Sequence, residues 1–309
     1  MPRSVLSTRN ATTPSSSRHG TARIITATIY SSAGPGRAFD LAKYFIVATE
    51  MFANGFSSSP SNTPPPFDGP DFPAVAIRDN VEAARRLLTS ELGVSHLRAT
   101  VGFSMGAEQT FQWAVSHPGF VDAIAVYCGT AKTHPHGVVR LEGAISALTA
   151  DAAFNDGRYT SPPIKGLTAW SRHWAGWVWS QEWWRRELFR PQAMTVDDVP
   201  AARLARDIIR DPNNLISQAR TWQRHNVGDT PGFGGNVEHA LGAIATRVLY
   251  MPGETDLYFP MPTRCTSVNS SSTLTLTPIP SLWGHSAGSG GNAADNEFLN
   301  HQVQRFLER

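Results

Sequence analysis

The stretch that most constrains the fold is residues 97–116, LRATVGFSMGAEQTFQWAVS, where a short apolar run meets a glycine-flanked serine and then a helical pattern. The apolar run predicts a strand, and the segment after the serine predicts a helix. A strand that passes into a helix through G-F-S-M-G must turn sharply, so side chains two residues before and after the serine would collide. Gly102 and Gly106 remove those side chains. Ser104 is therefore predicted to lie on a tight turn between a strand and a helix.

The rest of the chain alternates short apolar runs with helical patterns. The first two runs are apolar nearly throughout, as expected of strands buried on both faces of a parallel sheet. The alternation predicts an α/β fold with a mostly parallel central sheet and helices on both faces. The predicted strands are 23–30, 44–51, 97–101, 121–127, Arg247–Met251 and 274–279, and the predicted helices include 79–92, Met105–Ser116 and 295–307.

A block without clear strands interrupts this alternation and divides the chain. We predict a tail at 1–22, a core formed by 23–134 and 236–309, and an inserted helical lid at 135–235. The lid is dense in tryptophan, and positions 170, 174, 177 and 184 follow helical spacing, which predicts one shared face. Such a face could pack the lid on the core or form an apolar wall over a substrate pocket. Trp174 and Trp177 are our candidates for that wall.

Composition excludes several classes of function. The formal net charge of +2 does not favour a nucleic acid or an anionic membrane as partner, and no apolar run approaches a membrane span. Two cysteines make no disulfide framework, which favours a cytoplasmic protein. Residues 1–23 hold four arginines and no acid, so they fit either a disordered tail or a mitochondrial transit peptide.

Ser104 needs a base to take its proton, and in enzymes built around such a turn an acid and then a histidine follow in chain order. Asp256 comes directly after a late predicted strand, in VLYMPGETDLYFP, and we prefer it as the acid. Glu254 lies in the same loop and stays open as the alternative. His285, in IPSLWGHSAG, lies after the last predicted strand and before the last predicted helix.

The chemistry of these three side chains predicts nucleophilic catalysis. A serine hydroxyl is a weak nucleophile at neutral pH, and a histidine, whose ordinary pKa is near ~6.5, can accept its proton and return it later. Asp256 would orient the imidazole of His285, and acyl transfer would pass through an acyl-Ser104 intermediate. The backbone N–H of Met105, at a helix N-terminus, is predicted to stabilise the oxyanion.

Other site types are weakly supported. His134 and His136 are close enough in sequence to share a metal, but no cysteine or carboxylate cluster accompanies them, so we predict no metal. His136 is instead predicted to line the mouth of the substrate site, because loops after strands form the site in open α/β sheets. No G-x-G-x-x-G opens a helix after the first strand, so we predict no dinucleotide cofactor.

Several segments together resemble one branch of a known family. GPGRAFDLAKYFIV, NGFSSSPSNTPPPFDG, GFSMGAEQTFQWAVSHP, MPGETDLYFP and IPSLWGH are similar to the homoserine O-acetyltransferase-like branch of the α/β-hydrolases, over about residues 34–309. The resemblance implies the α/β-hydrolase fold, with an eight-stranded sheet and a helical lid after the sixth strand. It also implies that Ser104, Asp256 and His285 form the catalytic triad.

The sequence departs from that branch in four places. The segment between the first strand and GPGR is short, which leaves Ser31 as the candidate for the second oxyanion donor. The first strands of the family are not recognisable before Arg23. The position of the arginine that binds the homoserine carboxylate holds Ile145, and Arg140 lies more than a helical turn away. Ser286 stands where an aspartate usually follows the histidine. The last two departures disfavour homoserine as substrate.

We therefore predict a serine acyl-transfer enzyme, either an ester hydrolase or an O-acyltransferase that acts on a small-molecule ester or alcohol. No cofactor is predicted, although acetyl-CoA would be a co-substrate of an acyltransferase. The short segment before GPGR motivates an alternative, a catalytically impaired homologue that acts as a binding protein. A homodimer remains an open expectation.

Overall fold

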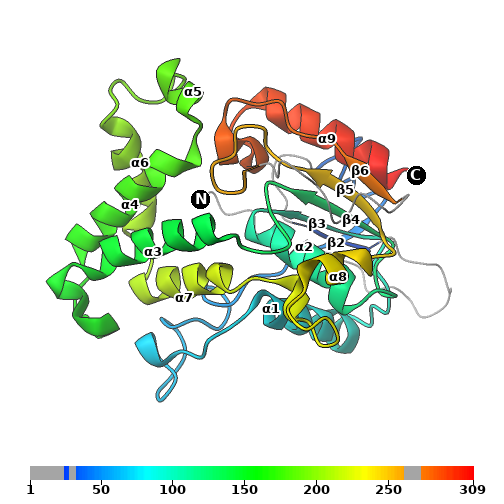
Figure 1. Ribbon diagram of the computed structural model, residues 1–309, viewed down its shortest axis with the longest axis horizontal. Coiled ribbons are helices and arrows are strands. Elements are labelled where there is room, and N and C mark those ends of the chain that lie inside the picture. The colour runs from blue at the N-terminus through cyan, green and yellow to red at the C-terminus, as the bar shows by residue number, and fades with distance from the viewer. Residues whose placement is uncertain (1–23, 28–32, 261–272) are drawn as a thin grey trace.

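A computed structural model describes residues 24–27, 33–260 and 273–309, and it shows a parallel sheet with a helical block beside it (Figure 1). Within these residues the sheet has six strands in the order β2-β1-β3-β4-β5-β6, and every neighbouring pair is parallel. The predicted α/β class and parallel sheet are confirmed, with six described strands rather than the eight implied by the resemblance. The strands are β1 (Ile24–Ala27), β2 (Phe45–Val47), β3 (Ala99–Phe103), β4 (Ala123–Tyr127), β5 (Arg247–Met251) and β6 (Leu274–Leu276).

The central strands are buried and the edges are short. Every residue of β3 and β4 is buried. Burial on both faces was predicted for the first two runs, and it is wrong for the second of them, because no residue of β2 is buried. β3 begins two residues later than predicted, because Leu97 pairs with Val121 only as an isolated bridge. β2 is much shorter than predicted, and Phe45 on this edge strand is half exposed.

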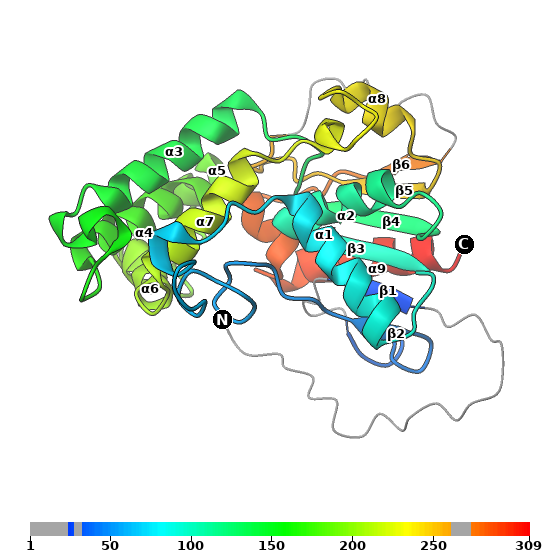
Figure 2. The same ribbon diagram turned by 90° about the horizontal axis from the view of Figure 1, so that it is seen from below.

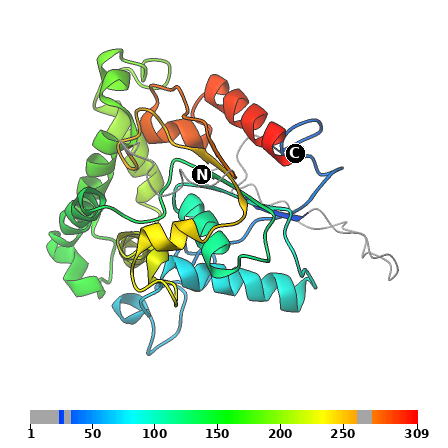
Figure 3. The ribbon, with the colours of Figure 1, turned by 45° about the vertical axis from the view of Figure 1, so that its right-hand side comes forward.

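Helices cover both faces of the sheet, as Figures 2 and 3 show from two directions. Helices α1, α2 and α8 lie on one face, where Val81, Phe111 and Ala240 share a core with β-strand residues such as Ile124. Helix α9 lies on the other face, where its Leu299 packs with a second set of strand residues. The four helices are α1 (Ile77–Arg86), α2 (Met105–Ser116), α8 (Val237–Gly242) and α9 (Ala293–Leu307).

Helix α1 differs from its prediction at both ends. Asp79 is not the N-cap residue but lies in the first turn, and its carboxylate accepts the N–H of Ala76 at 2.8 Å. After Arg86 the chain forms a π-helical turn, Leu87–Glu91. A π turn holds more residues than an α turn, so it rotates the following residues off the helical face. Leu92 was predicted to be on the buried face and is instead 45% exposed.

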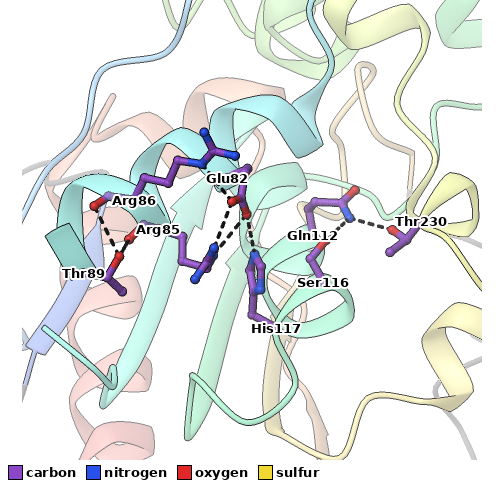
Figure 4. A network of polar contacts seen from close by, with 8 residues as sticks. All are labelled: Glu82, Arg85, Arg86, Thr89, Gln112, Ser116, His117 and Thr230. Carbon is purple, nitrogen blue, oxygen red and sulfur yellow. Dashed lines mark hydrogen bonds and ion pairs between the residues drawn. The ribbon is translucent and has the colours of Figure 1, made fainter.

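A polar network joins α1 to α2 above the sheet (Figure 4). Glu82 of α1 binds Arg85 at 2.9 Å and Arg86 at 3.1 Å, and it also reaches His117, the residue after α2, at 3.4 Å. In the same view Gln112 of α2 donates to Ser116 and Thr230. These contacts fix the helix that carries Ser104 at its start.

The helical block lies between β4 and β5 in the chain and to one side of the sheet (Figure 1). Its helices are α3 (Pro135–Thr149), α4 (Ile164–Val178), α5 (Gln181–Arg185), α6 (Asp198–Asp207) and α7 (Pro212–Gln223). Trp170 and Trp174 are buried on α4, but Trp184 belongs to α5, so the predicted shared face of four tryptophans is wrong. The chain turns at Trp179, where the backbone is extended, and this breaks the helical spacing. The exact limits 135–235 of the lid stay a prediction.

Candidate active site

Ser104 lies on the sharp turn between β3 and α2 that the glycine pattern predicted. Its backbone has φ 58° and ψ −126°, a strained conformation for a residue with a side chain. A Cβ atom on Gly102 would lie 2.0 Å from the carbonyl oxygen of Gly106, so the turn requires glycine there. The Ser104 N–H donates to the Tyr127 carbonyl of β4 at 3.2 Å, which ties the turn to the sheet.

His285 reaches this serine from the other end of the chain. It lies in a 3-10 helix, Gly284–Ser289, between β6 and α9. Its Nε2 is 2.9 Å from Ser104 Oγ, and its Nδ1 is 2.8 Å from Asp256 Oδ2. The imidazole can therefore accept the serine proton on one nitrogen while it donates the Nδ1 proton to the carboxylate on the other.

Asp256 follows β5 and is held by the backbone of its own loop. Its Oδ1 accepts the N–H of Tyr258 at 2.7 Å and of Phe259 at 3.2 Å, which leaves Oδ2 for His285. Asp256 is 2% exposed, whereas Glu254 is exposed to solvent. Of the two acids left open by the sequence, the structure brings Asp256 to the histidine.

Aromatic rings enclose the imidazole. Phe103, next to the serine, stacks on His285 with ring centroids 4.6 Å apart, and Tyr258 stacks on it at 4.3 Å. Phe259 adds a tilted contact at 5.5 Å. Because these rings exclude water, the hydrogen bonds of the imidazole act in a medium of low dielectric constant, where they are stronger.

Cys128 is a buried neighbour of the same carboxylate. It follows β4 with φ 47°, and burial raises the pKa of its thiol well above the ordinary value, with Asp256 adding to the shift. The thiol therefore stays protonated and uncharged at neutral pH. It packs beside the triad without offering a second nucleophile.

Of the two predicted oxyanion donors, Met105 lies within the described residues. Met105 is the first residue of α2, and N–H groups in the first turn of a helix have no acceptor within the helix. The Met105 N–H is therefore available next to Ser104. Ser31 lies outside the described residues.

The three substrate-side candidates differ in how closely they approach His285. Trp174 packs against Tyr258 with ring centroids 5.1 Å apart, so it is one ring away from His285. Trp177 and His136 pack on each other at 5.5 Å, and Trp177 is only half buried while His136 is exposed. Of these three residues, Trp174 is the one that the described ring contacts place one ring away from His285, through Tyr258.

Sequence reasoning missed two neighbours of the site, Tyr258 and Arg140. Tyr258 follows Asp256 by two residues, in TDLYF. This short spacing could have indicated that the tyrosine lies near the acid. Arg140 was set aside because it does not align with a known arginine position. Its signal was an arginine inside the apolar run VVRL of a helix that faces the core.

A metal site is not formed by the residues that the structure describes. No group of three or more His, Cys, Asp or Glu side chains lies together there, and His134 stands exposed at the start of α3. Within the same residues, no helix has the length and apolar character required to cross a membrane.

The chain is similar in sequence and in fold to known proteins. The alpha/beta hydrolase fold family matches residues 26–195. The chain belongs to the alpha/beta hydrolase family. An ethyl acetate hydrolase of Pseudomonas veronii is 36% identical over 281 residues, which cover 89% of this chain and 79% of that protein. A homoserine O-acetyltransferase of Symbiobacterium thermophilum is 28% identical over 299 residues, covering 89% of this chain and 76% of that protein.

The solved structures agree with the fold. The acetyl esterase MekB superposes with a TM-score of 0.87 at 33% identity, covering 94% of this chain and 87% of the MekB chain. The predicted relation to homoserine O-acetyltransferase-like proteins is confirmed, and the protein is an α/β-hydrolase-fold enzyme, an esterase or an acyltransferase. The comparisons favour this enzyme over the alternative of an impaired binding protein.

Proposed function

We propose that the protein is a serine esterase that hydrolyses acetyl esters of small alcohols, with Ser104, His285 and Asp256 as its catalytic residues. The observation that carries the proposal is the continuous hydrogen-bonded chain from Ser104 Oγ through His285 to Asp256. The names of the similar ethyl acetate hydrolase and acetyl esterase support acetyl esters as the substrate class.

The geometry supplies the first half of the reaction. Ser104 Oγ attacks the ester carbonyl carbon while its proton passes to His285 Nε2, which lies within hydrogen-bond distance. Negative charge develops on the carbonyl oxygen next to the start of α2, where the Met105 N–H and the helix dipole stabilise it. The carbon–oxygen bond to the alcohol then breaks, and the imidazolium returns its proton to the departing alcohol.

The second half releases acetate. A water molecule gives a proton to His285 Nε2 and attacks the acetyl-Ser104 carbonyl carbon. The protonated imidazole restores the serine hydroxyl as acetic acid leaves, and the acid then releases its remaining proton to the solvent. Asp256 holds the Nδ1 proton of His285 by a hydrogen bond throughout. No cofactor takes part in either half.

The test measures release of acetate from ethyl acetate and p-nitrophenyl acetate. We expect turnover by the native enzyme and a loss of about 10⁴-fold or more in kcat for Ser104→Ala. A fluorophosphonate probe should label the native chain and not the variant. Ser116→Ala, at the far end of α2, is the matched control and should keep both activities.

An acyltransferase would behave differently in the same assay. With acetyl-CoA and a small alcohol, transfer to the alcohol should exceed hydrolysis if acetyl-CoA is a co-substrate. Rapid hydrolysis of ethyl acetate with no acetyl-CoA turnover supports the esterase, and the reverse result overturns it. Cytoplasmic location and a homodimer stay predictions from the sequence.

A further inference from the structure

Arg140 is a buried cation with free donors inside the apolar helical block. It lies on α3 and is 3% exposed. None of its three guanidinium nitrogens has a hydrogen-bond partner among the described residues. Burial lowers the pKa of Arg140 to about 10, so the group still carries its charge at neutral pH. A buried charge without a partner is costly, so such a group usually serves a ligand or a pairing partner.

Aromatic faces surround this guanidinium but leave its donors unused. The guanidinium carbon lies 4.4 Å from the ring centroid of Tyr258, 4.7 Å from Trp222 and 5.1 Å from Trp174. These faces attract a cation electrostatically, and they accept no in-plane hydrogen bond. The Trp174 indole N–H, also buried, has no acceptor among the described residues either. The donors of Arg140 and of the Trp174 indole are therefore directed at no oxygen of the described residues.

Neither Glu108 nor Asp256 provides a hydrogen-bond partner for the guanidinium group of Arg140. Glu108 on α2 is fully buried, and neither of its carboxylate oxygens forms a hydrogen bond with Arg140. Burial raises the pKa of Glu108 well above its ordinary value and so favours the uncharged acid. The charge of Arg140 has a smaller effect in the opposite direction. Asp256 already uses both oxygens for the loop backbone and His285.

The free donors lie beside the catalytic centre. The Tyr258 ring contacts both the guanidinium of Arg140 at 4.4 Å and the imidazole of His285 at 4.3 Å. Met105, the neighbour of Ser104, packs against the same apolar cluster of helical-block residues. A substrate bound to Ser104 would thus need to extend only past the Tyr258 ring to reach Arg140.

From this placement we infer that Arg140, assisted by the Trp174 N–H, binds a carboxylate of the substrate, so that the preferred ester is one that carries a free carboxylate. The inference rests on the proposed function, since it names the substrate class of the same site. A planar carboxylate matches the fork of guanidinium donors and would supply the missing counter-charge. Ile145 lies five residues further along α3, about 140° around the helix from Arg140, and packs in the apolar cluster that includes Trp174 and Tyr258.

The experiment compares each acid with its isosteric amide at pH 7.5, where the carboxylates are ionised. One pair places the charge on the alcohol side, 4-acetoxybutanoate against 4-acetoxybutanamide. The other places it on the acyl side, monomethyl succinate against methyl succinamate. The readout is the ratio of kcat/KM for acid over amide. We expect a ratio of about 10 or more in one pair for the native enzyme, because hydrogen bonds between charged groups discriminate by that order.

Variants of Arg140 and of an exposed arginine distinguish a specific carboxylate site from general electrostatic attraction of the anionic ester. Arg140→Met should bring the ratio to about one or below, and Arg140→Lys should give an intermediate ratio because it keeps the charge without the fork. Arg172→Met, which removes an exposed cation of α4, should leave the native ratio. If Arg140→Met does not fold, the native ratio and the lysine variant still decide.

Two results would overturn the inference. One is a native ratio near one in both pairs together with good hydrolysis of p-nitrophenyl acetate, in which case the esterase stands without a carboxylate site. The other is an equal ratio in the native enzyme and the Arg140 variants. If no ester at all is hydrolysed, it is the proposed function that fails.

Discussion

Asp256 uses its two carboxylate oxygens for different partners, and this division explains its role. One oxygen is held by two backbone N–H groups of its own loop, and the other receives the Nδ1 proton of His285. The loop therefore fixes the carboxylate before the histidine meets it. A histidine oriented in this way keeps Nε2 free to accept the proton of Ser104.

We predict that Asp256→Asn lowers kcat by about 10⁴-fold while the fold is kept, because an amide at this point stabilises the wrong imidazole tautomer. Hydrolysis of p-nitrophenyl acetate measures the effect. Glu254→Gln is the matched control, since Glu254 is exposed in the same loop. Equal losses in the two variants would contradict the assignment of the acid.

Glu82 of α1 forms ion pairs with two arginines of its own helix and contacts His117, the residue after α2. The Arg85 side chain, through its hydrogen bonds, lowers the pKa of Glu82 to about 2 against a smaller opposing effect of burial, and Arg86 adds to the lowering. A carboxyl whose folded pKa lies below its unfolded value stabilises the fold above the unfolded pKa. That stabilisation is lost as the pH falls from about 4.5 toward 2.

We predict that Glu82→Gln lowers the free energy of unfolding by about 1 kcal/mol at pH 7, because the group is partly exposed and its ion pairs are screened. The difference from the native chain should shrink as the pH falls from 5 to 3, since the native carboxylate becomes protonated. Urea unfolding at several pH values measures this. Glu91→Gln, at an exposed position, should show no such pH-dependent difference, and a constant difference for Glu82→Gln would argue against the ion pairs.

At the scale of the whole molecule, the helical block and the loops after the sheet strands meet at His285. Tyr258 comes from the loop after β5, and it packs on Trp174 of α4 and on His285. Trp174 also stacks on Trp222 of α7 at 6.0 Å. The helical block therefore supports Tyr258, one of the rings that pack on the imidazole of His285.

We predict that Trp174→Ala lowers both stability and activity, because it removes a buried ring that supports Tyr258. Loss of a buried tryptophan side chain costs about 3–5 kcal/mol of unfolding free energy. Trp177→Ala, at a half-buried position on the same helix, should cost less than about 2 kcal/mol and leave kcat within a few-fold. Thermal unfolding and ester hydrolysis test both variants, and similar effects of the two would contradict a special role for Trp174.

Local patterns determined most of the fold and the chain order of the three candidate catalytic residues. The strand, the glycine-flanked serine and the helix predicted the turn at Ser104, because only glycine fits where a Cβ would meet a backbone oxygen. Chain order after two late strands predicted Asp256 and His285. Helical spacing failed at Trp184, since nothing in the spacing shows where the chain turns at Trp179.

Spatial relations between distant segments were decided only by the tertiary structure. The choice of Asp256 over Glu254 depends on which side chain of one loop points inward. The sequence could not predict this, because both acids lie in the same loop two residues apart. The burial of Arg140 among aromatic rings depends on how α3, α4 and α7 pack against the loop after β5. Sequence by itself determined that a serine, an acid and a histidine follow strands of one sheet, because strand ends are local features. Only the tertiary structure could place an unpaired cation beside them, because the packing of segments far apart in the chain sets which charges are left without partners.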